Sequence, residues 1–139
     1  MSRALTLRIA AVGAIAFVVG LDVDHVAFAR QQPGIKRTIL QRQDDPGSPK
    51  YEAVMGISEI PPGGTSGKHR HPGIELAYVL DGAVELVHEG KPPVTVKAGE
   101  ATMNTLGGIH TATNRGTVPV KILTVYIVEK GKPMAETIP

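Results

Sequence analysis

The chain has no cysteine and no tryptophan among its 139 residues, and aromatic residues make up only 4% of it. The absence of cysteine excludes disulfides, thiolate metal ligands and cysteine nucleophiles. No charge of one sign dominates: the net charge is +2, and no basic run with interleaved aromatic residues indicates a nucleic-acid interface. The length allows one ordinary domain, and a hydrophobic content of 42% is enough for one core. A small β-barrel with a core of Val, Ile and Leu fits this composition.

The apolar run near the N-terminus is too short to span a bilayer, for which about 20 residues are needed. It covers residues 9–21, carries no charge, and follows Arg3 and Arg8. This length matches the hydrophobic region of a signal peptide, and Ala27-Phe28-Ala29 has the small residues of a cleavage site. We therefore predict a signal peptide over residues 1–29, cleaved after Ala29, and a periplasmic or secreted protein with no other membrane association. A buried helix and an uncleaved anchor are the alternatives.

The rest of the chain divides into three parts by composition. Residues 30–50 are polar and rich in turn sequences, which predicts an N-terminal arm with one short edge strand at 35–40. Residues 51–130 alternate short apolar runs with turns such as Asp81-Gly82, which predicts about seven antiparallel strands and no helix. Residues 131–139 form a polar C-terminal tail on the surface. The predicted fold class is all-β, either a sandwich or a barrel.

Four residues are candidates for one metal site. His69, His71 and Glu75 share a parity, so in a strand their side chains point to one face. Imidazole and carboxylate together suit divalent first-row ions, and His110 is the candidate for a further ligand from elsewhere in the chain. The alternative is that these are solvated or ordinary core residues. This alternative does not explain why Glu75 would face the core, since burying an unpaired carboxylate costs several kcal/mol unless a cation is bound.

The spacing of these residues also resembles two signatures of the cupin superfamily. The run Gly63-x5-His69-x-His71-x3-Glu75-x6-Gly82 is similar to the first signature at every fixed position. The second is met by Gly99, Gly107, His110 and Asn114, with Thr105 where the family usually has proline. The resemblance implies a small jelly-roll barrel, also called a double-stranded β-helix, that is often dimeric. It further implies one divalent transition-metal ion (Fe, Mn, Ni, Zn or Cu) held by His69, His71, Glu75 and His110.

Two nearby residues are not expected to be ligands. His88 lies near the Glu89-Gly90 turn and is predicted to be solvated. Tyr78 has the opposite parity to Glu75 and is predicted to face outward. The sequence assigns no catalytic residue; the four candidate residues are assigned to metal binding alone.

Three functions are compatible with such a site. The first is a metal-dependent oxidoreductase of the dioxygenase type acting on a small organic molecule, because an open-shell ion with four protein ligands keeps open coordination positions. The second is a non-catalytic module that binds a small ligand or is merely stabilised by the metal. The third, a sugar isomerase or epimerase, would want a basic, aromatic cavity that the chain scarcely supplies. The final strand, expected at 118–128, is apolar on both faces, which predicts a homodimer.

Overall fold

The computed structural model describes residues 34–139, and the predicted signal peptide lies outside them. The described residues form ten β-strands and no helix, which confirms the all-β prediction. No helix in this range is therefore long and apolar enough to cross a membrane. The strands are β1 Lys36–Asp44, β2 Tyr51–Ile60, β3 His69–Arg70, β4 Gly73–Asp81, β5 Ala83–His88, β6 Val94–Lys97, β7 Ala101–Asn104, β8 His110–Thr113, β9 Val120–Glu129 and β10 Glu136–Thr137.

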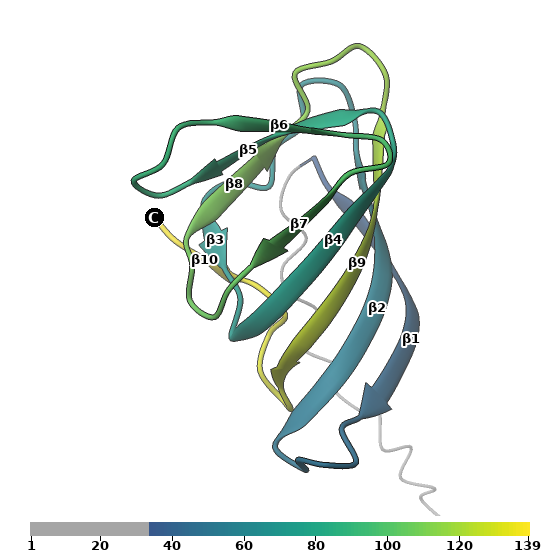
Figure 1. The fold of residues 1–139 in the computed structure, drawn as a ribbon, viewed down its shortest axis with the longest axis vertical. Coiled ribbons are helices and arrows are strands. Elements are labelled where there is room, and N and C mark those ends of the chain that lie inside the picture. The colour runs from purple at the N-terminus through teal and green to yellow at the C-terminus, as the bar shows by residue number, and fades with distance from the viewer. Residues whose placement is uncertain (1–33) are drawn as a thin grey trace, which may run out of the picture.

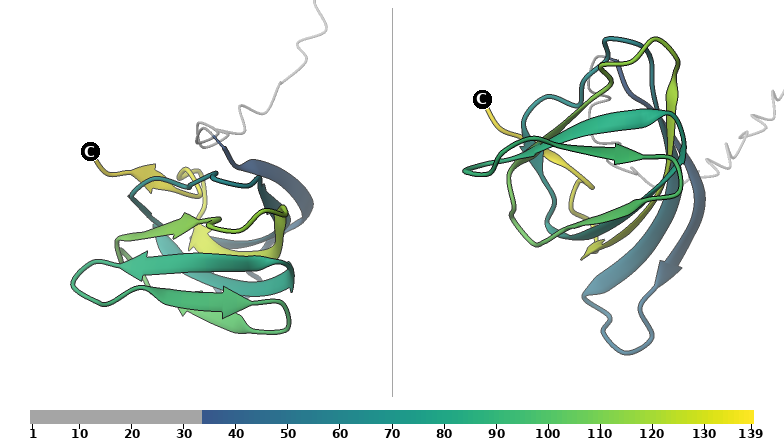
Figure 2. Two further views of the ribbon diagram at one scale, coloured as in Figure 1. Left: turned by 90° about the horizontal axis from the view of Figure 1, so that it is seen from above. Right: turned by 45° about the horizontal axis from the view of Figure 1, so that its top comes forward.

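The strands pair into two five-stranded antiparallel sheets that face each other (Figures 1 and 2). The first sheet has the order β1-β2-β9-β4-β7, and the second has the order β10-β3-β8-β5-β6. Consecutive strands repeatedly change sheets, because β4 lies in the first sheet and β3 and β5 lie in the second. This double-sheet jelly-roll arrangement is the barrel that the sequence predicts.

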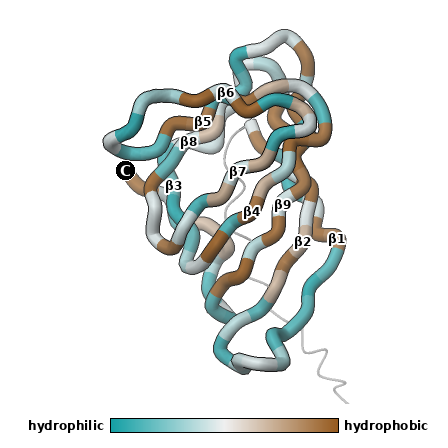
Figure 3. The backbone as a smooth tube through the Cα atoms, in the orientation of Figure 1, coloured by the Kyte–Doolittle hydropathy of each residue, from teal (hydrophilic) through white to brown (hydrophobic). Residues whose placement is uncertain are grey.

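The inner face of the first sheet follows from the alternation of its strands. In β9 every second residue from Val120 to Val128 is buried, and β2 alternates in the same way. Val, Ile and Leu from both sheets form the main hydrophobic cluster at one end of the barrel, which includes Ile60, Val79 and Leu86. Hydrophobic residues recur along β2, β9 and β4 (Figure 3). A second cluster of buried residues lies further along β2 and β9 and consists of Val54, Tyr126, Val128 and Met134. The buried polar residues of the candidate site lie beside it, and the ring centroids of His71 and Tyr126 are 5.2 Å apart.

Gly73, two residues after His71, allows β4 to lie in close contact with β9. A Cβ built at Gly73 would lie 1.9 Å from the carbonyl oxygen of Ile127, so no other residue fits without parting the strands. The Asp81-Gly82 turn matches its prediction, since Gly82 has a φ of 78°. Gly82 therefore permits the turn after β4, and the missing side chain of Gly73 permits the close approach of β4 to β9.

Both ends of the described chain take more part in the barrel than the sequence suggests. The arm forms a nine-residue strand, β1, where a short edge strand at 35–40 is expected. The tail forms β10, which pairs with β3, and Met134 is buried instead of running along the surface. The sequence signal is weak because the arm and tail are polar, and pairing with an existing strand supplies the stabilisation that composition lacks.

Candidate metal centre

Strands β3 and β8 bring three histidines together inside the barrel. His69 and His110 are directly opposite each other in the pairing of β3 with β8, and His71 follows β3 by one residue. Each imidazole offers one nitrogen, and the three nitrogens lie within 4.8 Å of one another. All three residues are at most 3% exposed. These three buried histidines could bind a metal ion.

The outer nitrogen of each imidazole is held by a backbone carbonyl. The Nδ1–O distances are 3.0 Å from His69 to Gly67, 3.0 Å from His110 to Gly108 and 2.5 Å from His71 to Met134. A carbonyl oxygen can only accept, so Nδ1 carries the proton in all three rings and Nε2 of each neutral ring keeps its lone pair. The backbone therefore fixes the tautomer that a metal ligand needs.

Glu75 approaches two of these histidines, His71 and His110, from β4 in the opposite sheet. Its Oε2 lies 3.1 Å from Nε2 of His71 and 3.5 Å from Nε2 of His110. Burial alone would raise the pKa of this carboxyl, but its contacts with His110 and His71 hold the pKa well below the usual range. Glu75 is therefore a buried carboxylate anion, 7% exposed. The structure brings together all four residues that the sequence singles out.

The three imidazoles and the Glu75 carboxylate are arranged to bind a cation, because without one they do not satisfy one another's hydrogen-bonding groups. The Nε2 atom of His71 is fully buried and has no hydrogen-bond partner among the described residues, although it faces the Glu75 carboxylate. Electron pairs from neutral imidazoles and a carboxylate repel one another unless a proton or a metal ion lies between them. Three imidazole nitrogens and one carboxylate oxygen form a donor set for a divalent first-row ion. The residues present therefore fit the metal that the resemblance implies.

His69 is held in its neutral form. Its pKa is lowered to about 4, first by burial and then by the neighbouring His110. The rings of His69 and His110 are 4.3 Å apart between centroids, so a proton on either would be unfavourable for the other. A neutral His69 at pH 7 is ready to act as a ligand without releasing a proton.

Sequence reasoning missed Asn104, which lies at the end of β7 and is 3% exposed. Its Nδ2 donates to Oε2 of Glu75 at 2.6 Å and also lies 3.1 Å from Nε2 of His110. In the register of the first sheet, Asn104 is directly opposite Glu75. The sequence signal was its parity with Thr102, which places both residues on the inner face of β7.

His88 is also part of this network, although the sequence predicts a solvated residue. Its Nε2 lies 2.6 Å from Oδ1 of Asn104, and the amide oxygen can only accept, so His88 donates. His88 is opposite His110 in the pairing of β5 with β8, and the two rings are 5.8 Å apart. Alternation along β5 turns its side chain inward even though the turn follows immediately. Tyr78, by contrast, faces outward as predicted.

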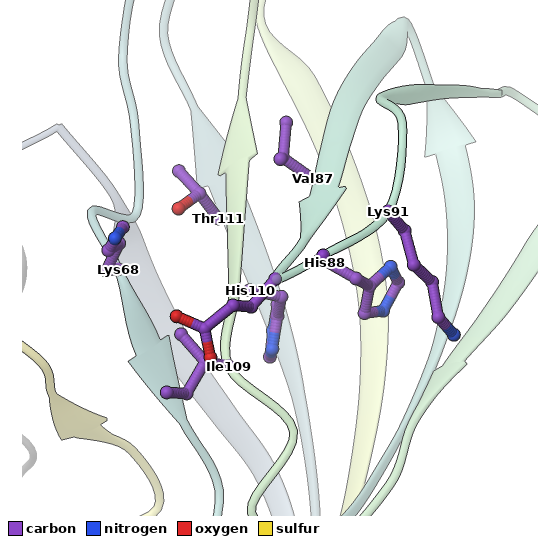
Figure 4. Close-up of a pocket in the computed structure, with 9 residues that line it drawn as sticks. Lys68, Val87, His88, Lys91, Ile109, His110 and Thr111 are labelled. Carbon is purple, nitrogen blue, oxygen red and sulfur yellow. The ribbon is translucent and has the colours of Figure 1, made fainter.

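Two hollows lie near the histidines. A surface pocket of about 480 Å³ is lined by residues that include Lys68, Val87 and Thr111. Figure 4 shows that Val87 and Thr111 lie on one side of their strands and the rings of His88 and His110 on the other. His88 and His110 also line the larger pocket, and the smaller cavity inside the barrel adjoins Glu75 and Asn104.

The fold and the site together define a class of protein: a small double-sheet barrel with three inward histidines and a carboxylate. The cupin domain family matches residues 56–126, about half of the 139 residues. This chain belongs to the cupin family.

Individual relatives agree with this assignment. The chain is 32% identical over 71 residues to a protein of Thermotoga maritima named oxalate-binding protein, covering 50% of this chain and 58% of that relative. A structure described as a predicted oxalate decarboxylase from Thermotoga maritima is 27% identical with a TM-score of 0.57, covering 68% of this chain and 80% of the other. A Klebsiella pneumoniae protein with a double-stranded β-helix domain has a TM-score of 0.64 at 18% identity, covering 81% and 90%, and so shares the fold.

Proposed function

We propose that this protein is a metal-dependent oxidoreductase of the dioxygenase type that acts on a small organic molecule. The observation that carries the proposal is the convergence of His69, His71, His110 and Glu75 inside the barrel. An open-shell Fe, Mn, Ni or Cu ion held by four protein ligands retains open coordination positions and can exchange electrons with a substrate. Zinc would supply only Lewis-acid chemistry.

The protein's own residues define what else the site does. The backbone carbonyls of Gly67, Gly108 and Met134 orient the three imidazoles. Asn104 orients the carboxylate of Glu75. The barrel wall excludes bulk water from the site, because these side chains are almost fully buried. The adjoining interior cavity measures about 40 Å³, which suits a substrate that places a few non-hydrogen atoms beside the metal.

Metal content of protein purified without added metal tests the first half of this proposal. We expect near-stoichiometric Fe, Mn, Ni or Cu by mass spectrometry, and its loss in a His69→Ala, His110→Ala double variant. Oxygen uptake by the metal-loaded protein, with oxalate, glycolate and catechol as probes, tests the second half. A folded protein that contains no metal and refuses added metal would overturn the proposal.

A small-molecule-binding protein without turnover is the second candidate. The name of the oxalate-binding relative supports it, since that name describes binding. Zinc as the native metal, or saturable oxalate binding without oxygen uptake in calorimetric titration, would favour this candidate over the oxidoreductase.

We also propose that two copies associate through the outer face of the first sheet. Large apolar side chains are exposed on β2, β4 and β7 of this sheet, each 37–57% accessible: Met55, Ile74, Leu76, Tyr78, Leu80 and Met103. Ion pairs of opposite charges bound this face at its two ends, Glu59–Lys121 and Lys50–Glu129. A neutral apolar face suits an identical face related by a two-fold axis.

Light scattering at micromolar protein tests this association. We expect a dimer mass for the wild type and a monomer mass for Leu76→Asp, whose added charge is central to the face. Lys91→Asp, in the loop that joins β5 and β6 of the opposite sheet, is the control and should remain dimeric. A monomeric wild type would refute the proposal.

Export is proposed on the strength of residues 1–29 alone. The measured mass of the mature protein, purified from a cell that secretes it, should equal that of a chain that begins at Arg30. An intact N-terminus on protein recovered from the membrane would favour an uncleaved anchor.

A further inference from the structure

Arg37 differs from every other arginine that the structure describes. The others each contact a carboxylate: Arg42 contacts Glu52 at 3.1 Å, Arg70 contacts Glu136 at 2.8 Å, and Arg115 contacts Glu85 at 3.0 Å. No hydrogen bond or ion pair to a described residue engages Arg37. A guanidinium carries five donors, so this group is free to bind an anion.

Arg37 lines the interior cavity that adjoins the metal centre. It lies on β1 opposite Ser58 of β2, and both side chains line the cavity. The same cavity reaches Glu75, Asn104 and Tyr126. Burial raises the pKa of Tyr126 well above its usual range, whereas the positive charge of Arg37 opposes this rise, which places the guanidinium within electrostatic reach of the phenol. Arg37 and Glu75 thus line one cavity.

The charges around this cavity call for an anionic ligand once a metal is present. Among the described residues that line it, only Arg37 and Glu75 are charged, and these two do not form an ion pair with each other. Their charges sum to zero, and a divalent ion beside Glu75 would raise the local charge to +2. In a space of low dielectric, such an excess is strongly unfavourable unless an anion enters.

We propose that Arg37 binds a carboxylate group of the substrate, so that the site takes a small carboxylic acid whose remaining atoms face the metal side of the cavity. This inference rests on the proposed metal-dependent function. The planar fork of a guanidinium matches a carboxylate with two parallel hydrogen bonds. The cavity of about 40 Å³ has room for about three water molecules, which suits an acid of two or three carbons. Apolar walls such as Val79 and Ile122 leave the rest of the ligand few polar contacts.

A pair of probes isolates the carboxylate. Glycolate and glycolamide have the same hydroxyl and nearly the same shape, but only glycolate carries a carboxylate. Calorimetric titration of the metal-loaded wild type should show glycolate binding at least about tenfold more tightly than glycolamide. Arg37→Gln should weaken glycolate binding about 10- to 100-fold and leave glycolamide unchanged. Arg37→Lys should fall between the two, because lysine keeps the charge but not the fork.

Lys36→Gln is the matched control, since Lys36 is adjacent on the same strand, is exposed, and pairs with Glu59. It removes the same charge from the protein and should bind glycolate as the wild type does. Metal content is measured in every sample. If metal is bound but the wild type fails to bind glycolate, or binds it as tightly as Arg37→Gln does, this inference alone is overturned. Absence of metal from the wild type overturns the proposed function and this inference with it.

Discussion

Replacing Asn104 with alanine should weaken metal binding without touching any proposed ligand. The Asn104 amide is the link between Glu75 on one side and His88 on the other, with hydrogen bonds of 2.6 Å to each. Alanine removes both bonds and leaves the Oε2 atom of Glu75 without its neutral donor. The carboxylate is then free to rotate away from the histidines.

Two independent estimates agree on the size of this effect. A hydrogen bond to a charged group contributes about 1.5–3 kcal/mol. Loss of a residue that orients a metal ligand typically costs about 10- to 100-fold in metal affinity, which corresponds to about 1.4–2.8 kcal/mol. We therefore expect the dissociation constant for Mn²⁺ or Zn²⁺ to rise about 10- to 100-fold in Asn104→Ala. The bond from His88 joins two neutral groups, so His88→Ala should cost less, about 2- to 10-fold.

Competition with a chromophoric chelator measures these constants, and circular dichroism confirms that each variant is folded. His88→Gln is the matched control, because its side-chain amide can still donate to Asn104 and should keep metal affinity close to that of the wild type. A folded Asn104→Ala protein that binds metal within about threefold of the wild type would refute the reasoning. The network would then be ordinary polar packing.

Two further predictions concern stability. Gly73→Ala should lower the free energy of unfolding, measured in urea, by at least about 3 kcal/mol, because the new Cβ would lie 1.9 Å from the carbonyl oxygen of Ile127. Gly90→Ala is the control: φ is 74° there but nothing lies within 4 Å, so it should lower this free energy by only about 1–2 kcal/mol. Equal losses in the two variants would contradict the steric argument. Acid should destabilise the metal-free protein: His69 has a pKa of about 4 when folded against 6.5 when unfolded, so the unfolded state binds the extra proton, and about 3 kcal/mol is lost as pH falls from 6.5 to 4. Glu75, whose pKa is depressed, adds a loss below its unfolded pKa of about 4.5, and His69→Asn should flatten the upper part of this profile; an unchanged profile would contradict it.

Local patterns were sufficient to predict the fold class and the four residues that converge. Shared parity singled out His69, His71 and Glu75, but the expectation that they converge from one strand was wrong: His69 and His71 lie at β3, and Glu75 faces them from β4 of the opposite sheet, because the chain changes sheets after His71. The turn at Asp81-Gly82 and the strand β9 could also be predicted from the sequence, because glycine and β-branched residues act through local conformation. His110 joined the set through its spacing from Gly107 in a family signature.

The hydrogen-bond partners of these residues could not be predicted from the sequence, because they depend on which strands become neighbours in the sheets. Asn104 contacts Glu75 because β7 pairs with β4 in a particular register. His88 contacts Asn104 across the barrel interior, between strands of different sheets. A polar residue near a turn reads as solvated in sequence, and only closure of the barrel turns such a residue into part of a buried network.

The two polar segments at the ends of the described chain show how far this principle extends. In sequence they read as an arm and a tail, yet each supplies a group to the barrel interior. The carbonyl of Met134 fixes the tautomer of His71, and β1 carries Arg37 to the cavity beside Glu75. The cupin domain match ends at residue 126 and begins at residue 56, so both groups lie outside it. Residues inside the match provide the proposed metal ligands, which would be needed for any reaction at this site. Residues outside it provide the side chain that we propose selects the substrate, so identity within the matched range alone is a weak guide to the substrate of this protein.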